Sequence, residues 1–299
     1  MAVSVQTPAM ADQLQYPCQA DGEFDMTVVV DECAVPCTHS KDASASADTD
    51  SWMIDTPQDM GSDLSTDLGS EDSEPEQTSS GEVSEDSPMS CSNNPFSVEE
   101  TLMIFDWDDT LLPSTWVMKQ GLSLVEESVV TEAQAAELSR VAEAARTTLL
   151  AARRHGSVII VTNGEQGWVE LSCWKFMPTL APALEGVPII SARSTYEKQG
   201  ITSPFEWKVC AFSKEVEEHY KGSGPTGRRN VISLGDSMHE HLALMSVTQG
   251  VPRCRAKSLK FASFPELSQL VEQHELVSGR MGDIADHDGD LVLEVHSSP

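Results

Sequence analysis

Short apolar runs alternate with segments of helical length from residue 101 onward, and this alternation constrains the fold more than any other feature. Such runs predict strands of a parallel sheet that are buried on both faces, because helices cover both faces of such a sheet. A further strand is expected at 257–262, where polar and apolar side chains alternate as in an edge strand. The four apolar runs are 102–105, 158–161, 187–190 and 231–234.

The segments between these runs carry start signals for helices. Thr131 with Gln134 forms a capping-box pattern, and Ser203 with Glu206 forms a second one. Gly156 is expected to end the first of these helices in the left-handed conformation. The pattern as a whole predicts an α/β fold, with a Rossmann-like parallel sheet and helices on both faces. Two further helices are expected, at 238–246 and 265–276.

The N-terminal third of the chain differs in composition from the rest. Residues 1–96 contain 20 Asp and Glu residues and one basic residue, Lys41, so about −19 of the net charge of −29 lies there. Apolar residues are too scattered in this region to offset the entropy of ordering it. We therefore expect a disordered, acidic, Ser-rich region at 1–96, a folded domain at 97–278 and a solvated acidic C-terminal tail at 279–299.

Charge and cysteine content argue against several classes of protein. Binding to the phosphate backbone of nucleic acid requires clustered Lys and Arg, so no nucleic-acid partner is expected for a chain of net charge −29. Seven Cys residues at irregular spacing are typical of reduced thiols. The sequence contains neither a secretory signal nor an apolar run of membrane-spanning length. We expect no membrane partner, and a location in the cytoplasm or the nucleus.

Eight polar residues stand at or near the ends of the predicted elements. They form a D-x-D-x-T pattern after the first run, a Thr-Asn pair after the second, a Lys in the helix that starts after Ser203, and a D-x-x-x-E pattern after the fourth run. Because ligands of open α/β sheets collect at the carboxyl ends of the strands, we expect these side chains to meet there. They are Asp106, Asp108, Thr110, Thr162, Asn163, Lys208, Asp236 and Glu240.

The predicted meeting point carries an excess of negative charge. Four carboxylates beside one Lys would repel each other in a half-buried site. A hard divalent cation with oxygen ligands relieves this repulsion, and Mg²⁺ is the expected metal. No organic cofactor is expected.

The order of these groups resembles the four motifs of the haloacid dehalogenase superfamily. Those motifs are D-x-D-x-T after an apolar strand, a Thr or Ser at a strand end, a Lys, and G-D-x-x-x-(D/E), and they match over residues 100–276. The resemblance implies a Mg²⁺-dependent phosphatase that works through an aspartyl-phosphate intermediate. It indicates the class of chemistry better than the substrate.

The resemblance also implies roles for individual residues. Asp106 is expected to attack phosphorus, and Asp108 to protonate the leaving oxygen and then activate water. Thr162 would hold phosphoryl oxygens, and Lys208 would offset negative charge. The metal ligands would be Asp106, the backbone carbonyl of Asp108, and Asp236. Supporting roles fall to Thr110 in the turn, Asn163, and Glu240 through water.

Cap domains of this superfamily are inserted after the first or third strand and control access to the site. Segments 113–130 and 192–202 are too short here to fold as caps. By resemblance, the open site favours a large phosphorylated substrate such as a phosphoprotein. Most of the Trp residues near the motifs are expected to pack in the core, with Trp116 as the preferred substrate contact. The four are Trp107, Trp116, Trp168 and Trp207.

Two other functions stay open at this stage, as does the oligomeric state. One is a non-catalytic binding module of the same fold, recruited through its acidic tail. In that case Asp108, Asp109 and Asp236 would only cap turns or helices, and Lys208 would face solvent. The other is a phosphotransferase that passes phosphate to an acceptor other than water.

Overall fold

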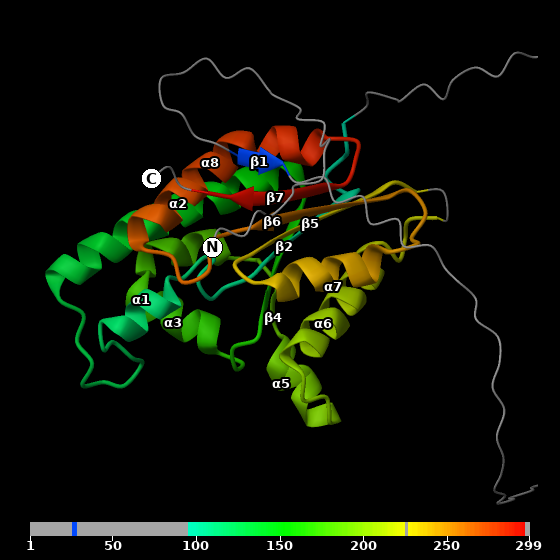
Figure 1. Cartoon of the computed structure of the whole chain (residues 1–299). Coiled ribbons are helices and arrows are strands. Elements are labelled where there is room, and N and C mark those ends of the chain that lie inside the picture. The colour runs from blue at the N-terminus through cyan, green and yellow to red at the C-terminus, as the bar shows by residue number, and fades with distance from the viewer. Residues whose placement is uncertain (1–25, 29–94, 225–226, 297–299) are drawn as a thin grey trace, which may run out of the picture. The chain divides into compact units, whose positions relative to one another are not determined.

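A seven-stranded sheet organises the residues that the computed structural model describes, which are 26–28, 95–224 and 227–296. Strands β2 to β7 run parallel, and β1 pairs with β7 in the antiparallel direction (Figure 1). The predicted parallel, Rossmann-like α/β sheet is confirmed. The strands are β1 Met26–Val28, β2 Thr101–Phe105, β3 Ser157–Thr162, β4 Ile189–Ser191, β5 Arg229–Gly235, β6 Cys254–Lys260 and β7 Leu291–Val295.

The order of the strands reverses at one point in the middle of the sheet. Across the sheet the order is β1-β7-β6-β5-β2-β3-β4, so the chain moves outward from β2 to one side and then returns to add β5 on the other. The strand order therefore reverses between β2 and β5. Connections leave these two strands in opposite directions, and in open α/β sheets this opens a crevice for ligands beyond their carboxyl ends.

Helices cover both faces of the sheet, as predicted. On one face α2 packs with α8, and on the other α6 packs with α7 (Figure 1). Side chains of β2 alternate between the two cores, because Met103 and Phe105 join the first and Leu102 and Ile104 the second. The helices are α1 Ser114–Lys119, α2 Glu132–His155, α3 Trp168–Phe176, α4 Ala181–Leu184, α5 Ala192–Tyr196, α6 Pro204–His219, α7 Met238–Thr248 and α8 Leu267–Asp286, with 3-10 turns at Pro178–Leu180 and Glu197–Gln199.

Two of the three predicted helix-end features differ in detail from the prediction. The capping box of Thr131 and Gln134 is confirmed at the start of α2. At α6, Ser203 accepts a hydrogen bond from the backbone N–H of Glu206, which is one half of the expected box. The left-handed conformation predicted for Gly156 is wrong, because its φ of −170° is extended. A Cβ there would lie 2.7 Å from the carbonyl oxygen of Thr101, so the glycine is needed for close packing on β2.

The C-terminal boundary was predicted wrongly. Instead of a tail at 279–299, α8 continues to Asp286 and β7 joins the sheet beside β6. Leu293 and Val295 of β7 are almost fully buried. For the same reason β6 is an interior strand rather than the predicted edge. β4 is the edge strand on the other side and is only partly buried, although its sequence is apolar.

Most of the predicted disordered region lies outside the described residues. That prediction for 1–25 and 29–94 therefore stays a prediction. Two parts of the region are described: β1, which is not predicted from the sequence and pairs Met26 with Val295, and residues 95–96, where Phe96 is buried and belongs to the folded domain.

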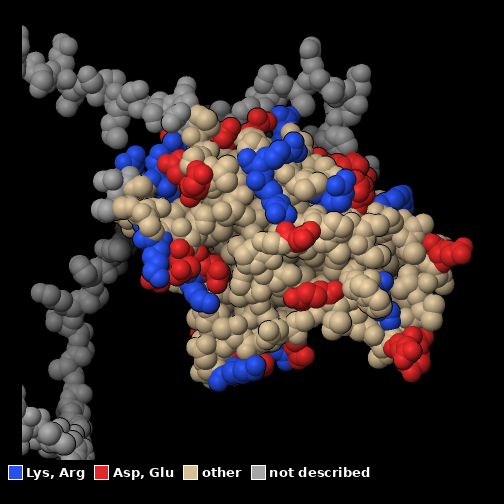
Figure 2. All heavy atoms as spheres, turned by 180° about the vertical axis from the view of Figure 1, so that it is seen from behind, with Lys and Arg blue, Asp and Glu red and all other residues tan. Residues whose placement is uncertain are grey.

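The surface of the described chain carries charges of both signs. Figure 2 shows small groups of Lys and Arg beside groups of Asp and Glu, with broad uncharged areas between them on that face. Among the described residues, no helix combines the length and the apolar character that crossing a membrane requires.

Candidate functional site

Two of the predicted site residues leave the sheet at the point where the strand order reverses. Phe105, the last residue of β2, pairs with Leu234 of β5, and the backbone N–H of Asp106 donates to the carbonyl oxygen of Leu234 at 2.8 Å. Asp236 directly follows the last residue of β5. Because neighbouring parallel strands end at the same edge, Asp106 and Asp236 emerge side by side.

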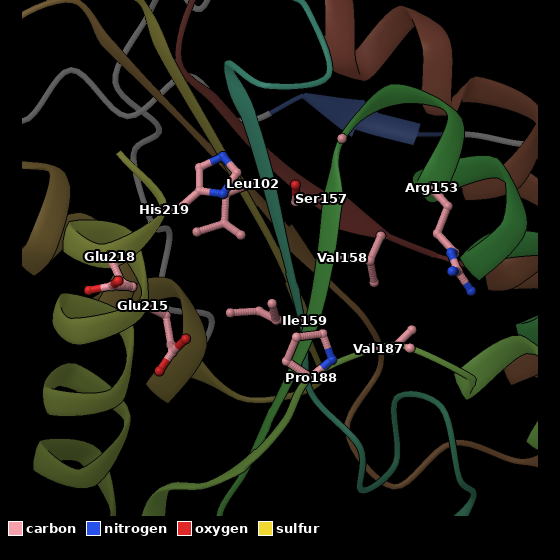
Figure 3. Close-up of a pocket in the computed structure, with 12 residues that line it drawn as sticks. Leu102, Arg153, Ser157, Val158, Ile159, Val187, Pro188, Glu215, Glu218 and His219 are labelled. Carbon is pink, nitrogen blue, oxygen red and sulfur yellow. The ribbon is translucent and has the colours of Figure 1, made fainter. Parts of the chain in front are cut away.

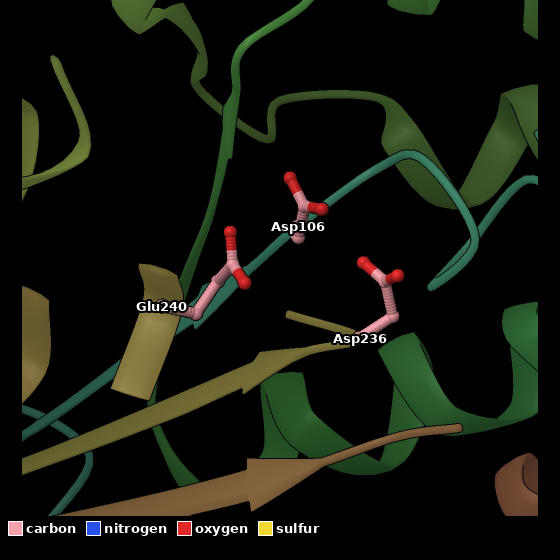
Figure 4. Close-up of side chains that lie close together, drawn as sticks. All are labelled: Asp106, Asp236 and Glu240. Atoms are coloured by element: carbon pink, nitrogen blue, oxygen red, sulfur yellow. The ribbon is translucent and has the colours of Figure 1, made fainter. Parts of the chain in front are cut away.

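Three carboxylates converge at this edge, and we call Asp106, Asp236 and Glu240 the acidic cluster. One oxygen from each lies within 4.8 Å of the others. Figure 4 shows the three side chains approaching from the end of β2, the end of β5 and the start of α7. Asp106 and Glu240 are 7% and 4% exposed, and Asp236 is partly buried. The predicted meeting of Asp106 with Asp236 is therefore present, and Glu240 lies closer to them than the sequence analysis assigned.

Lys208 reaches the acidic cluster from the first turns of α6. Its Nζ donates to Asp106 Oδ1 at 2.6 Å and to the carbonyl oxygen of Val161 at 2.8 Å, and it lies 2.9 Å from Glu240 Oε1. The side chain is 1% exposed. The alternative of a solvent-facing Lys208 is wrong, because α6 packs its apolar face on the sheet and carries Lys208 inward with it.

The electrostatics of the cluster show incomplete charge compensation. Burial raises the pKa of Asp106 well above its usual range, although Lys208 opposes the change. Burial, with the charges of Glu240 and Asp109, raises the pKa of Asp236 to about 7. One ammonium therefore does not balance the negative charge of the buried carboxylates.

Lys208 and Glu240 act on each other as an ion pair. Burial opposes the charge on Lys208, but Asp106 and Glu240 together raise its pKa above the usual value. Burial likewise opposes the charge on Glu240, yet Lys208 and a hydrogen bond from Ser237 lower the pKa of this carboxyl. Both groups of this pair are therefore charged at neutral pH.

Glu240 is held by the start of α7. Ser237 is the N-cap of this helix, and its backbone N–H and hydroxyl both donate to Glu240 Oε2. The Glu240 side chain folds back over Gly235, where a Cβ would come within 2.4 Å of its Cγ. The N-cap is Ser237 and not Asp236, which leaves the carboxylate of Asp236 facing the cluster.

Asp108 lies beside the acidic cluster and is held by the last residue of β3 and the first residue of α3. Its Oδ1 accepts from the indole Nε1 of Trp168 at 3.0 Å, and its Oδ2 accepts from the hydroxyl of Thr162 at 3.4 Å. Burial raises the pKa of Asp108, against the effect of the Trp168 hydrogen bond. The next residue, Asp109, is the turn cap: its φ is +50° and its carboxylate accepts from the backbone N–H of Thr115 at 2.8 Å.

Thr110 and Asn163 support the loops rather than the cluster. Thr110 is fully buried, and its carbonyl oxygen lies 2.9 Å from Nε2 of His274, a buried residue of α8. Asn163 Nδ2 donates to the carbonyl oxygen of Pro204 at 3.1 Å and ties the end of β3 to the start of α6. His274 is not among the residues predicted from the sequence, where it is one polar residue on the apolar face of α8.

The four Trp residues near the motifs serve different purposes. Trp116 is 8% exposed and belongs to the core, so the expectation that it contacts substrate is wrong. Trp107 and Trp207 are also buried. Trp168 is the one that touches a predicted catalytic side chain, through Asp108.

A separate cavity of about 430 Å³ lies near the first residues of β3, at the end of the strand away from the acidic cluster (Figure 3). Arg153 stands on one side of it, and Glu215 and His219 of α6 on the other. The guanidinium of Arg153 is already used, because it donates to the carbonyl oxygens of Ala183 and Glu185 at 3.2 Å each. This cavity contains none of the predicted site residues.

The fold and the site together define a Rossmann-like α/β protein with an acidic cluster at the switch point of its sheet. No protein-family model matches the chain, and neither a curated protein nor a solved structure is similar enough to it to count as a match. The likeness to the haloacid dehalogenase superfamily therefore rests on the sequence motifs alone.

Proposed function

We propose that this protein is a Mg²⁺-dependent phosphatase in which Asp106 attacks phosphorus and forms an aspartyl phosphate. One observation carries the proposal: Asp106 and Asp236 leave neighbouring strands with oxygens within 4.8 Å, while Lys208 contacts Asp106. The resemblance of the motifs to the haloacid dehalogenase superfamily adds the reaction type.

The donor set fits a hard divalent cation. Every side-chain ligand that the cluster offers is a carboxylate oxygen, as Mg²⁺ prefers. In the described part of the chain, Lys208 is the one cation in ion-pair contact with these carboxylates. The raised pKa values of Asp106 and Asp236 mark negative charge that a further cation would neutralise. By resemblance, Asp106, Asp236 and the backbone carbonyl of Asp108 would hold Mg²⁺, which would offset charge on the transferring phosphoryl group.

Each side chain then has a separate task. A carboxylate oxygen of Asp106 forms the new bond to phosphorus, and Lys208 opposes the effect of burial on the pKa of Asp106 and offsets the incoming charge. The carboxyl of Asp108 gives its proton to the leaving oxygen and later takes one from the attacking water. Burial, which raises the pKa of Asp108, favours the protonated form that the first step needs.

The surroundings of Asp236 favour a bulky substrate. Met238 follows Asp236 by two residues and is 47% exposed, and Phe264 is 68% exposed. Phe264 lies next to Ser263, whose hydroxyl donates to the carbonyl oxygen of Asp236 at 2.6 Å. Because segments 113–130 and 192–202 are too short to form a cap, a large substrate could reach these exposed side chains beside the site. We therefore extend the proposal to phosphoproteins as the substrate class.

Phosphate release by the full chain tests the proposal. We expect Mg²⁺-dependent hydrolysis of phenyl phosphate and of a subset of phosphopeptides, and loss of both in Asp106→Asn. Asp283→Asn is the matched control, because this exposed carboxylate lies on α8 outside the site. Activity in Asp106→Asn equal to that of the unsubstituted protein would reject Asp106 as the nucleophile.

The same experiment separates the two alternatives. A phosphotransferase would form phosphoenzyme and pass the phosphoryl group to an added alcohol in preference to water. A non-catalytic binding module would release no phosphate from any substrate and would bind its partner equally well after Asp106→Asn.

A further inference from the structure

The indole of Trp168 makes direct contact with the side chain that the proposed reaction uses for proton transfer. Trp168 is the first residue of α3, on the loop that follows β3. Its Nε1 donates to Asp108 Oδ1 at 3.0 Å. None of the motifs in the sequence includes this residue.

The position of the Trp168 ring is fixed by its neighbours. A Cβ on Gly164 would lie 2.4 Å from Cδ1 of the ring, so the indole rests directly against this glycine. On the other side, the hydroxyl of Ser172 donates to the carbonyl oxygen of Trp168 and accepts from Nε1 of Trp107 at 3.0 Å. The ring therefore rests against Gly164, and the backbone that carries it is bonded to the next turn of α3.

Asp108 is held at both of its carboxyl oxygens. Trp168 donates to Oδ1, and the hydroxyl of Thr162 lies 3.4 Å from Oδ2. The backbone N–H of Gly164 donates to the Thr162 oxygen at 2.9 Å, which leaves the hydroxyl proton free to point at Asp108. The indole bond to Oδ1 at 3.0 Å is shorter than the Thr162 contact with Oδ2 at 3.4 Å, so Oδ1 is the more firmly held oxygen and Oδ2 is the one left to act on a substrate.

We propose that Trp168 is a positioning residue that orients the carboxyl of Asp108 for proton transfer, an inference that rests on the proposed function. As the bond between phosphorus and the leaving oxygen breaks, Oδ2 of Asp108 gives its proton to that oxygen, and a carboxylate oxygen of Asp106 takes its place on phosphorus. Trp168 transfers no proton and keeps its N–H bond to Oδ1 throughout.

The leaving group provides a readout that a packing role would not move. Nitrophenolate leaves without a proton, whereas phenolate from phenyl phosphate leaves faster when an acid protonates it. In Trp168→Phe, which removes the N–H and keeps an aromatic ring, we expect kcat/KM to fall about tenfold for phenyl phosphate and by less than about twofold for p-nitrophenyl phosphate. Trp174→Phe is the matched control, because Trp174 lies on the same helix and is 76% exposed.

A second variant keeps the indole but displaces it. Gly164→Ala places a methyl group where the Trp168 ring now lies and 3.2 Å from Thr162 Oγ1, so we expect a loss on both substrates that is larger on phenyl phosphate. Thermal unfolding of each variant checks that it is folded. Equal losses on both substrates in Trp168→Phe, or no loss on either, would overturn the positioning role.

The outcomes for Asp106→Asn keep the two proposals apart. If Asp106→Asn is inactive and Trp168→Phe behaves like the unsubstituted protein, only the role of Trp168 is rejected. If Asp106→Asn retains full activity, the proposed function itself fails, and the positioning role fails with it.

Discussion

Replacing Asp236 by Asn tests the charge balance of the acidic cluster without any substrate. Burial and neighbouring carboxylates raise the pKa of Asp236 from 3.8 to about 7 in the folded protein. Between these two pH values the folded state binds more protons than the unfolded state, so stability falls as the pH rises through this window. Above pH 7 the charged Asp236 lowers the stability of the folded state by the full amount. Asn at this position stays neutral, so the variant does not lose this stability.

The size of the effect follows from the same two values. At about 1.36 kcal/mol per pH unit, the interval from 3.8 to about 7 corresponds to roughly 4 kcal/mol. Because Asp236 is only partly buried, solvent screening reduces this to about 2 kcal/mol. We therefore expect Asp236→Asn to raise Tm by about 4–8 °C at pH 8 in the presence of a chelator. Near pH 4 the difference from the unsubstituted protein is expected to vanish.

Magnesium supplies the complementary arm of this experiment. At a concentration 100 times its Kd, a ligand that binds only the folded state stabilises it by about 2.7 kcal/mol. We expect Mg²⁺ to stabilise the unsubstituted protein by this amount at pH 8 and not to stabilise Asp236→Asn. Thermal unfolding at pH 4, 6 and 8, with and without Mg²⁺, measures both effects, and Asp283→Asn serves as the control. A variant that is less stable than the unsubstituted protein at pH 8 without metal would refute the reasoning.

Three further expectations concern stability. Lys208→Met should lower the free energy of unfolding by about 3–5 kcal/mol, because it leaves two buried carboxylates unpaired. Urea unfolding at pH 7 measures this change. The control is Lys221→Met, which removes an exposed ion pair and should change the free energy of unfolding by less than about 1 kcal/mol. Burial lowers the pKa of His274 from 6.5 to about 4. The folded state should therefore lose about 3 kcal/mol of stability as the pH falls from 6.5 to 4. Urea titrations should show that His274→Gln removes this part of the pH dependence. Gly156→Ala should destabilise the fold by about 1–3 kcal/mol in the same assay, because the added methyl group overlaps with β2. Gly222 has open space around it, so Gly222→Ala should not destabilise the fold. Equal effects of the two substitutions would contradict the packing argument.

Local signals in the sequence were sufficient for much of the fold. The start of α2 could be predicted because Thr131 and Gln134 make their hydrogen bonds within one turn. Gly156 was placed correctly but for the wrong reason, because its contact with Thr101 of β2 is not visible in the sequence around it. Features that depend on residues distant in sequence could not be predicted from such local signals.

The missed strand β7 illustrates the same limit. Its five residues, LVLEV, follow an acidic stretch, and a pattern this short does not distinguish a strand from a tail. Leu293 becomes buried only because β7 pairs with β6 and packs near α8. Conversely, the apolar run that contains β4 predicts an interior strand, although β4 lies at the edge of the sheet.

The candidate site could be predicted only where backbone rules decide it. Asp106 and Asp236 follow apolar strands, and the common edge of a parallel sheet brings them together. The inward direction of Lys208 depends on how α6 is rotated, and the contact of Trp168 with Asp108 depends on two side-chain conformations. The sequence indicates which groups are present, whereas the distances between them come from tertiary packing.

The acidic cluster is a place where the fold works against its own stability. Buried carboxylates this close together raise each other's pKa, and Lys208 compensates only part of their charge. A second buried cation in the protein would stabilise the fold, but it would remove the excess charge that we propose attracts a divalent ion. Such conflicts between local stability and arrangement are expected at functional sites. Incomplete compensation is therefore what a cation-dependent site requires, and a gain in stability on neutralising Asp236 is its measurable consequence.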